Sequence, residues 1–324
     1  MCTAVSWLCG EHYFGRNLDL EYSYRESVTV TPRRFPLYFR HLGVLERHHA
    51  MIDMAYVQNG YPLYYEGTNE MGLSVAGLHF PESAVYQKPC GRDGELAAFE
   101  LIPWLLGRCA TLGEAVESLR GITLTNEAFS EELPAAPLHW LLADREGAVV
   151  LEACRDGVHL YPNPVGVLTN EPPFPMQQMN LCNYLNLTPE IPVNRFAEGL
   201  ELKPYSRGMG AFGLPGDLSS PSRFVRAAFL KCNSIPGAGE AARVSQFFHI
   251  LNGVAQQRGC VRLGEGRYER TIYSCCCNTF RGIYYYQTYE NPGLTAVELH
   301  REQLDGTELK SYPLRTECRI MREN

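Results

Sequence analysis

The chain has 324 residues, of which 45% are hydrophobic and 20% are charged, and its formal net charge is −7. This is an ordinary globular composition, and the length allows one large domain or two of typical size. The acidic balance argues against a dedicated nucleic-acid binder, which would normally be basic. The apolar runs are far shorter than the roughly 20 residues of a membrane-spanning helix. We therefore expect neither a nucleic-acid partner nor a membrane partner.

The chain contains twelve cysteines. Its N-terminal segment lacks the basic and apolar regions of a secretory signal, so we expect a cytoplasmic protein with reduced thiols. No CxxC pair occurs, and Cys275, Cys276 and Cys277 are too closely spaced to surround one zinc ion. We predict no metal site. Small buried hydrophobic residues are the simplest interpretation of most cysteines, including Cys9, Cys109, Cys154 and Cys232.

The N-terminal part of the chain, from residue 1 to residue 80, predicts β-strands, because segments rich in β-branched and aromatic residues are separated by Gly and charged positions. These segments are 3–8, 12–17, 27–33, 50–57, 62–69 and 72–80.

Two helices are predicted within residues 94–121. Apolar residues recur every three or four positions over 96–106 and would form one helical face, although Pro103 should kink that helix. Thr111, followed three residues later by Glu114, has the spacing of a capping box and is expected to begin the second helix.

The remaining chain returns to strands, then to helices, and ends in strands. The pattern predicts a hairpin over 138–154, two short strands over 157–172, an irregular region over 172–221, helices over 222–232 and 241–256, and strands over 270–276, 282–289 and 294–300. No regular βαβ alternation appears, so an α+β fold with helices covering sheets is favoured. Since no repeat or linker marks a boundary, we expect a single domain over residues 1–324.

Cys2 is the candidate nucleophile. Removal of the initiator Met1 would place a thiol and a free α-amine on one residue, with ordinary pKa values of about 8.5 and about 7.7–8.0, so that the amine can serve as the general base. Position alone would leave an accidental second residue as the simpler interpretation. Arg16 and Asp19 in the segment FGRNLD change that balance. A guanidinium lowers the pKa of a nearby thiol, and a carboxylate can hold an amine.

Segments along nearly the whole chain resemble the choloylglycine hydrolase family, which includes bacterial conjugated bile salt hydrolases and penicillin V acylases. They occur in family order: MCT, FGRNLDLEYSY, TNEMGLSVAGLHFPE, LPAAPLHWLLAD, VGVLTNEP, GLPGDLSSPSRFVRAAFL, FFHILNGVA and GIYYYQTYENPGLTAVELHREQLDG. The resemblance implies a bacterial N-terminal-nucleophile hydrolase with a four-layer αββα sandwich. It also implies that only the initiator methionine is lost and that no cofactor is used.

The resemblance further implies a role for each of five polar residues. Cys2 would be the nucleophile and its α-amine the base, Arg16 would lie beside the thiolate, and Asp19 would accept a hydrogen bond from the α-amine. Asn170 would donate its side-chain amide to the oxyanion, and Arg223 would complete the polar site. Donors aimed at a developing oxyanion are usually the largest single catalytic contribution.

His79 departs from the family pattern, which usually has asparagine at this position in bile salt hydrolases and often tyrosine in penicillin V acylases. In the family the backbone N–H here contributes to the oxyanion hole, so the chemistry should survive the change. Whether the imidazole contacts substrate or lies at the rim of the site is left open, since a neutral histidine can both donate and accept.

The family resemblance places Leu18, Tyr65, Phe129 and Leu133 around the apolar face of the acyl group. The expected reaction is release of glycine or taurine from a conjugated bile acid. Penicillin V acylase activity is the alternative, and a catalytically silent family member is less favoured because the polar set is intact. The preference between glycine and taurine, and transfer of the acyl group to other amines, stay open.

The segment over 186–216 is long for a connection within one compact domain. In the family the corresponding stretch reaches a neighbouring subunit. We therefore expect a homo-oligomer, and specifically a homotetramer with dihedral symmetry.

Overall fold

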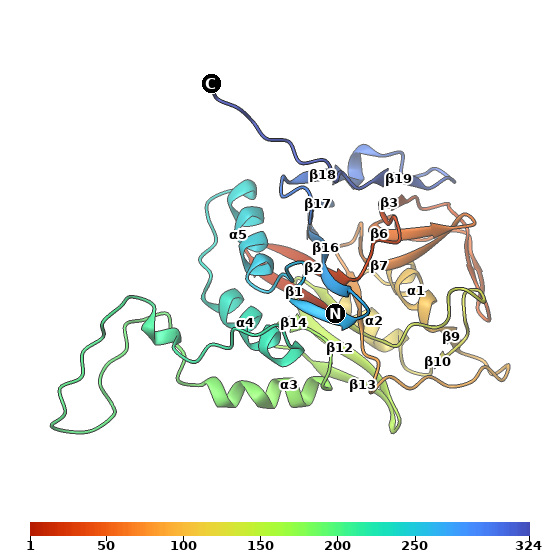
Figure 1. The fold of residues 1–324 in the computed structure, drawn as a ribbon. Helices are drawn as coiled ribbons and strands as arrows, with labels where there is room; N and C mark the ends of the chain where they lie inside the picture. Colours follow the sequence, from red (N-terminus) through yellow and green to blue (C-terminus); the bar gives the residue numbers. More distant parts are fainter.

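The computed structural model describes residues 1–324 and contains two large antiparallel β-sheets that lie face to face (Figure 1). The first sheet has the order β14 (Val167–Leu168), β1 (Cys2–Cys9), β2 (Glu11–Leu20), β16 (Arg267–Asn278), β17 (Ile283–Thr288) and β18 (Thr295–Glu298), with β15 (Val261–Gly264) paired to β16. The second has the order β13 (Gly157–Pro162), β12 (Gly147–Cys154), β11 (Leu138–Asp144), β8 (Ser74–His79), β7 (Tyr61–Asn69), β6 (Met51–Gln58), β3 (Ser27–Thr31) and β19 (Lys310–Pro313).

Helices cover the outer face of each sheet. The helices α4 (Ser220–Asn233) and α5 (Glu240–Asn252) pack on β1, β2, β14 and β16 of the first sheet (Figure 1). The helices α1 (Leu101–Arg108) and α2 (Leu112–Ser118) pack on strands of the second sheet. The predicted four-layer αββα sandwich is therefore confirmed.

The central strands of the second sheet are buried on both faces, because they lie between the first sheet and a helical layer. Successive side chains of a strand point to opposite faces. In β8, Ala76 and Leu78 accordingly join the apolar cluster shared with the first sheet and α5, whereas Val75 joins the cluster that contains Trp104 of α1. This double burial explains why central strands such as β8 and β11 are largely apolar, whereas the edge strands β13 and β19 are partly exposed.

The predicted N-terminal strands, up to residue 80, are confirmed, as are the 138–154 hairpin, the helices over 222–232 and 241–256, and the C-terminal strands. Thr111 caps α2 as predicted: its side chain accepts a hydrogen bond from the Glu114 N–H at 3.2 Å, and the Glu114 carboxylate accepts one from the Ala110 N–H.

The predicted start of the helix near residue 96 is wrong. Residues Glu95–Ala97 form a short strand, β9, which pairs in parallel with β10 (Thr123–Thr125). A 3₁₀ turn over Ala98–Glu100 follows, and α1 begins only at Leu101. Pro103 therefore lies in the first turn of the helix, where a proline is tolerated, and produces no internal kink.

The irregular region over 172–221 contains a helix that the sequence pattern did not predict. This helix, α3 (Phe174–Asn180), begins directly after Pro173, and the 3₁₀ turns Leu181–Tyr184 and Met209–Ala211 lie further along. The surrounding prolines masked it, although proline is favoured at a helix start. Smaller elements were also missed: β4 (Leu37–Phe39), β5 (Gly43–Leu45), β9, β10, β15, β19 and the 3₁₀ turn Leu299–Arg301.

The prediction that single cysteines are buried holds for only some of them. Cys9 and Cys109 are buried, but Cys154 is only partly buried and Cys232 is exposed at the last turn of α4. His249 is exposed on α5 and not a core residue, because it lies four positions after the exposed Ser245 on the outer face.

His48 is buried, although it lies in the charged stretch LERHHA, which would be expected to form a solvated loop. Its ring nitrogens lie 2.7 Å and 2.8 Å from the carbonyl oxygens of His49 and Phe35.

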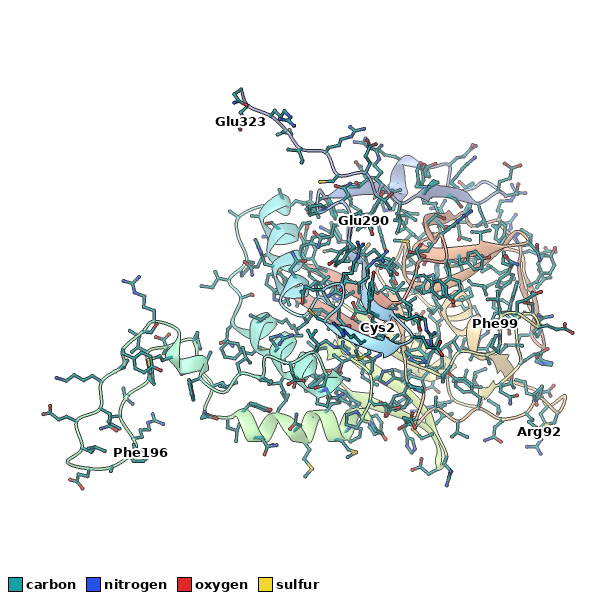
Figure 2. All side chains as sticks on the ribbon, in the orientation of Figure 1. Cys2, Arg92, Phe99, Phe196, Glu290 and Glu323 are labelled. Carbon is teal, nitrogen blue, oxygen red and sulfur yellow. The ribbon has the colours of Figure 1, made fainter.

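A long arm projects from the body between the 3₁₀ turns 181–184 and 209–211 (Figure 1), with Phe196 at its far end (Figure 2). Many of its apolar side chains are exposed: Leu185, Ile191, Val193, Phe196, Leu200, Leu202 and Tyr205. None of the helices has the length and apolar character required to cross a bilayer.

Candidate active site

Cys2 lies at the start of β1 in the interior of the molecule (Figure 2) and is 3% exposed. The register of β1 with β14 pairs Ala4 with Leu168, so the chain that continues from β14 brings Asn170 opposite Cys2. The Cys2 backbone N–H donates a hydrogen bond of 2.8 Å to Asn170 Oδ1. Strand pairing thus joins two predicted site residues that are 168 positions apart.

Arg223 ties these two residues to α4. Its Nη2 donates to Asn170 Oδ1 at 2.7 Å, and its Nη1 donates to the Cys2 carbonyl and, at 2.7 Å, to Thr3 Oγ1. The side chain is fully buried in the first turn of the helix. A buried guanidinium that is bonded this fully fixes the position of the surrounding backbone. Arg223 therefore joins Cys2 and Asn170 in one buried polar cluster, and its role in the reaction stays a prediction.

Asp19 lies beside the N-terminus on β2. Its carboxylate accepts a hydrogen bond of 2.6 Å from Thr271 Oγ1 and lies 3.9 Å from Arg223, while Oδ2 is buried without a hydrogen-bond partner. Burial raises the pKa of Asp19, and Arg223 acts against that rise. With Met1 present, the Cys2 nitrogen is an amide bonded to Asn170, and no hydrogen bond joins it to the Asp19 carboxylate. The role assigned to Asp19 stays a prediction.

Arg16 lies on β2 and reaches toward the second sheet. Its Nη1 donates to the carbonyl oxygens of Gly77 and Tyr65, and Nη2 is buried without a partner. Burial acts to lower the pKa of Arg16, but the negative charges nearby, that of a Cys2 thiolate foremost, raise it overall. Arg16 is therefore within the electrostatic reach of Cys2, and its free Nη2 is available to stabilise negative charge there.

Glu66 lies behind Arg16 and was not singled out in the sequence. Its carboxylate lies 3.7 Å from Arg16 and accepts hydrogen bonds from Tyr273 at 2.7 Å and Tyr284 at 2.6 Å. Burial raises the pKa of Glu66, while Arg16 lowers it. The signal that could have identified Glu66 is a charged residue within the largely apolar strand segment YPLYYEGTN. Its partners come from strands more than 200 positions away, which no local pattern reveals.

Asn170 is held in a defined orientation. Its backbone N–H donates to Ser220 Oγ at 2.8 Å, and its Nδ2 donates to the His79 carbonyl at 2.8 Å. The side-chain NH₂ group has two hydrogens, so one remains for a further acceptor. The amide of Asn170 and the end of β8 therefore border the same space, as the predicted oxyanion hole requires.

His79 ends β8 and its side chain is exposed. Desolvation by the surrounding chain lowers the pKa of His79, as does the positive charge of the Met1 ammonium; Glu269 and Glu171 act in the opposite direction. The imidazole is therefore mainly neutral at neutral pH. The role of the imidazole, either contact with substrate or a position at the rim of the site, stays a prediction.

The backbone next to Asn170 is supported by a buried pair, His139 and Glu152, that was not singled out in the sequence. His139 and Glu152 are both fully buried, with His139 Nδ1 3.1 Å from Glu152 Oε1 and Nε2 2.9 Å from the Thr169 carbonyl. A carbonyl oxygen only accepts hydrogen bonds, so Nε2 carries a proton. His139 lies on β11, and its link to Thr169 depends on packing between the two sheets.

The four apolar residues predicted to surround the acyl group fall into two sets. Leu18 pairs directly opposite Cys2 in the sheet, and the Tyr65 carbonyl accepts from Arg16. Phe129 and Leu133 instead close a tight turn, in which the Phe129 N–H donates to the Leu133 carbonyl at 3.0 Å. No hydrogen bond or ring contact joins that turn to Cys2.

The Phe129 turn is anchored by an aromatic cluster. The Phe129 ring lies 5.4 Å from each of the rings of Tyr61 and Phe99. Tyr61 is therefore a packing residue in this cluster.

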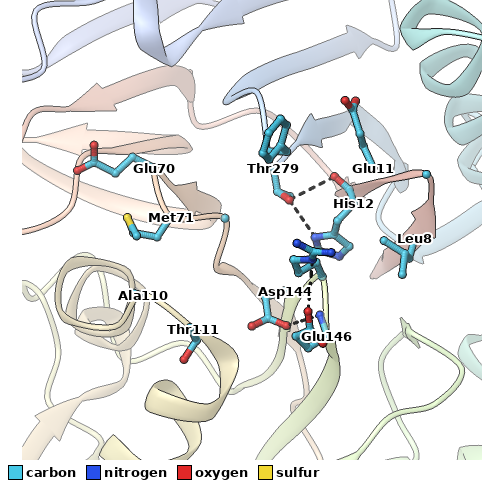
Figure 3. Close-up of a pocket in the computed structure, with 14 residues that line it drawn as sticks. Leu8, Glu11, His12, Glu70, Met71, Ala110, Thr111, Asp144, Glu146 and Thr279 are labelled. Carbon is cyan, nitrogen blue, oxygen red and sulfur yellow. Dashed lines mark hydrogen bonds and ion pairs between the residues drawn. The ribbon is translucent and has the colours of Figure 1, made fainter.

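A cavity of about 560 Å³ lies near the other end of β1, beside Leu8 and His12 (Figure 3). Six residues of extended strand separate it from Cys2, or about 20 Å. Its polar groups are already bonded: the His12 nitrogens lie 2.9 Å from Ser6 Oγ and 3.0 Å from Thr279 Oγ1. Asp144, also on its wall, accepts hydrogen bonds from two backbone N–H groups. This cavity therefore lacks the free polar groups and the nucleophile of an active site.

Comparison with known proteins agrees with this geometry. The family model described as "Linear amide C-N hydrolases, choloylglycine hydrolase family" matches residues 2–312. A "Bile salt hydrolase/transferase" of Lactiplantibacillus plantarum is 50% identical over 324 residues, covering 100% of both chains. A "Bile salt hydrolase/transferase" of Clostridium perfringens is 35% identical over 319 residues, covering 96% of both.

Solved structures show the same fold. The C2A mutant of conjugated bile acid hydrolase from Clostridium perfringens superposes with a TM-score of 0.91 at 34% identity, covering 100% of both chains. Penicillin V acylase from Agrobacterium tumefaciens gives a TM-score of 0.77 at 18% identity, covering 96% of this chain and 90% of the other, and bears on the fold alone. The chain has the N-terminal-nucleophile hydrolase fold and belongs to the choloylglycine hydrolase family of enzymes that hydrolyse linear amides.

Proposed function

We propose that this enzyme hydrolyses the amide bond of glycine- or taurine-conjugated bile acids. The relatives that match it over most or all of their length bear names of bile salt or conjugated bile acid hydrolases. The observation that carries the proposal is the buried polar cluster around Cys2, in which Asn170 and Arg223 bond to the Cys2 backbone and Arg16 lies within its electrostatic reach.

Catalysis begins once Met1 is removed. The free α-amine of Cys2 takes the proton from Sγ, and the thiolate attacks the carbonyl carbon of the substrate amide. The tetrahedral intermediate collapses as the α-ammonium gives its proton to the leaving nitrogen, the C–N bond breaks, and a thioester remains on Cys2. Water then attacks the thioester, the C–S bond breaks, and the bile acid leaves with the thiol restored. In both halves of the reaction the Cys2 α-amine carries the proton: from Sγ to the leaving nitrogen during acylation, and from water to the departing sulfur during hydrolysis of the thioester.

Preorganised charge lowers the barrier. Arg16, with its free Nη2, stabilises the thiolate, and Glu66 behind it holds the guanidinium in place. The second hydrogen of Asn170 Nδ2 and the backbone N–H of residue 79 receive the oxyanion. Asn170 Oδ1, which is 2.8 Å from the Cys2 nitrogen, and the unpartnered Asp19 Oδ2 orient the α-amine after processing.

The apolar face of the steroid lies against Leu18, Tyr65, Phe129 and Leu133. Leu18 lies directly across from Cys2, and Tyr65 joins the Arg16 contact, which supports their place beside the reacting carbonyl. The Phe129–Leu133 turn would form the outer wall of the pocket, since an apolar cleft of this kind suits a rigid apolar ligand.

Parallel assays of the processed enzyme on glycocholate, taurocholate and penicillin V test the proposal. Turnover of the two bile salts well above that of penicillin V is expected, because the relatives that match nearly the whole chain are named for bile salts or conjugated bile acids. Preferred turnover of penicillin V would instead support the alternative activity. A matched Cys2→Ala variant, expected to be inactive, identifies the turnover with this site and excludes a silent chain.

We further propose that a second copy of this chain covers the projecting arm. Exposed apolar side chains along a segment that leaves the body are typical of an interface. The arm would pack on neighbouring copies to give the homotetramer expected from the family resemblance.

A further inference from the structure

Met1 occupies a slot that recognises an amino group and a carbonyl together. Its ammonium donates a hydrogen bond of 3.0 Å to Glu269 Oε1 and one of 2.7 Å to the Asp19 carbonyl. Its own carbonyl accepts a hydrogen bond of 2.9 Å from the Asp19 N–H. Because all three contacts are made to Met1, its removal leaves two acceptors and one donor without these partners.

Glu269 is the charged wall of this slot. It lies on β16, two residues before Thr271, which pairs with Asp19 across the sheet. Its side chain is only 14% exposed, and Oε2 is buried without a hydrogen-bond partner. A largely buried carboxylate with no partner is unfavourable. Loss of Met1 would remove its cation, so the slot then favours another positive group.

We propose that, in the chain that begins at Cys2, this slot binds the ammonium group of the amine that the reaction releases, and of free amino acids that compete with water for the acyl-enzyme. The inference rests on the proposed function, because it requires loss of Met1 and a thioester on Cys2. It assigns to Glu269 a binding role that the hydrolytic mechanism above does not include.

The slot lies within reach of the reacting atoms. Nitrogens of adjacent residues in an extended chain are roughly 3.5 Å apart, from standard backbone bond lengths. A nitrogen bound where the Met1 nitrogen lies is therefore about one hydrogen-bond length from the Cys2 α-amine. That amine protonates the departing nitrogen during acylation. An incoming amine must approach the same α-amine, because a reaction and its reverse share one path, so the slot holds its nitrogen beside the group that exchanges protons with it.

The transfer step balances as the reverse of acylation. The bound ammonium first loses one proton to water, and the freed lone pair attacks the thioester carbonyl beside the neutral Cys2 α-amine. The new C–N bond forms, the α-amine takes the second proton from the attacking nitrogen and gives it to the departing thiolate, and the C–S bond breaks. The products are the amide and the restored thiol of Cys2.

The contacts also select the class of amine. Glycine and taurine each carry an ammonium group and an anionic group a short distance away. The ammonium fits Glu269 and the Asp19 carbonyl, and the anion fits the Asp19 N–H that Met1 leaves free. An amine that is uncharged at neutral pH gains nothing from the Glu269 carboxylate.

A partition experiment tests the assignment. The processed enzyme, a Glu269→Gln variant and a Glu265→Gln control are given taurocholate with either isotope-labelled glycine or hydroxylamine, and the ratio of amide product to cholate is measured by mass spectrometry. Glu265 is a highly exposed control on the same hairpin. Since hydroxylamine is largely uncharged at neutral pH, its ratio should not change in Glu269→Gln. The glycine ratio should fall about tenfold, the scale of a lost charge-assisted hydrogen bond, and Glu265→Gln should match the unmodified enzyme.

Three results would overturn the assignment. One is an unchanged glycine ratio in Glu269→Gln. Another is an equal fall for both acceptors, which would mean that Glu269 acts on the Cys2 α-amine. The third is the absence of labelled glycocholate with the unmodified processed enzyme at any glycine concentration.

A binding measurement separates this inference from the proposed function. Saturation-transfer NMR with methylammonium on the processed chain does not require turnover. Binding that is lost in Glu269→Gln would support the slot even if taurocholate were not hydrolysed. No binding to the unmodified chain would overturn the slot even if taurocholate were hydrolysed.

Discussion

The side-chain oxygen of Asn170 accepts a hydrogen bond of 2.8 Å from the backbone nitrogen of Cys2. This contact fixes which way the amide faces: Oδ1 points to Cys2, and Nδ2 points to the end of β8 at His79. One atom of Asn170 thus orients the proposed base while the other borders the proposed oxyanion hole. A single side chain links the two parts of the mechanism.

The first prediction separates these two parts. Asn170→Ala should lower kcat by about 10²–10³, because one oxyanion donor is lost. Asn170→Asp keeps the oxygen that faces Cys2 but replaces the donor, so it should lose at least as much. Steady-state kinetics with a conjugated bile salt measures both. Near-normal activity in Asn170→Asp would show that the side-chain NH₂ does not serve the oxyanion.

The companion variant is His79→Asn, which decides between the two readings of the imidazole. If only the backbone N–H acts, kcat for conjugated bile salts should stay nearly unchanged, and this is the result we expect. A changed preference between bile salt and penicillin V would instead mean that the ring contacts substrate.

The second prediction concerns processing. The active enzyme should begin at Cys2, because an α-nitrogen bonded to Met1 cannot act as a base. Intact-mass measurement of active protein checks this, and full activity in a chain that retains Met1 would contradict it. Cys2→Ser should be severely impaired, since a hydroxyl is much less acidic than a thiol, and Cys2→Ala should bind substrate without turnover.

The third prediction concerns the arm over 186–216. Light scattering at micromolar concentration should give the mass of a homotetramer, and a monomer mass would contradict the proposal. A Phe196→Asp, Tyr205→Asp double variant should dissociate the assembly, because charges are placed on side chains that are 82% and 84% exposed in one subunit. Phe280→Asp, similarly exposed but outside the arm, is the matched control and should leave the mass unchanged.

The fourth prediction uses Asp53, which is fully buried on β6 with neither carboxylate oxygen hydrogen-bonded. It faces Gly67 across the strand pair, where any Cβ would lie 1.4 Å from its Oδ1, so only glycine fits there. Burial, followed by the charge of Glu66, raises the pKa of Asp53 well above its ordinary value. The folded chain therefore keeps this proton at pH values where the unfolded chain has lost it.

The sign of the effect follows from that difference. As pH rises above about 4, the unfolded state loses the Asp53 proton first, and the free energy of unfolding falls by up to about 1.4 kcal/mol per pH unit until the folded pKa is reached. Asp53→Asn removes this dependence. Its stability relative to the unmodified chain should therefore rise between pH 4 and pH 7 in urea denaturation. A difference that does not vary with pH would contradict the raised pKa, and Asp93→Asn on the surface is the control.

Local sequence patterns were sufficient to predict most of the secondary structure. The N-terminal strands up to β8 and the helices α4 and α5 have strong periodicity in the chain itself, and the Thr111 cap depends on a partner only three residues away. Prediction was wrong near residue 96 and incomplete over 172–221. In the first case a parallel strand pairing outweighed helical periodicity, and in the second a proline-rich segment concealed a helix.

By itself the sequence determined the family and the αββα layers, because these depend on motifs that stand in the chain in order. The same motifs predicted a group of site residues: Cys2, Arg16, Asp19, Asn170 and Arg223. Only the tertiary structure decided what each of them touches. The contact of Asn170 with Cys2, the support of Arg16 by Glu66 and the hold of Glu269 on the Met1 ammonium each join strands distant in sequence. A lone carboxylate in a strand carries no local sign of its partner, since register and sheet stacking choose that partner.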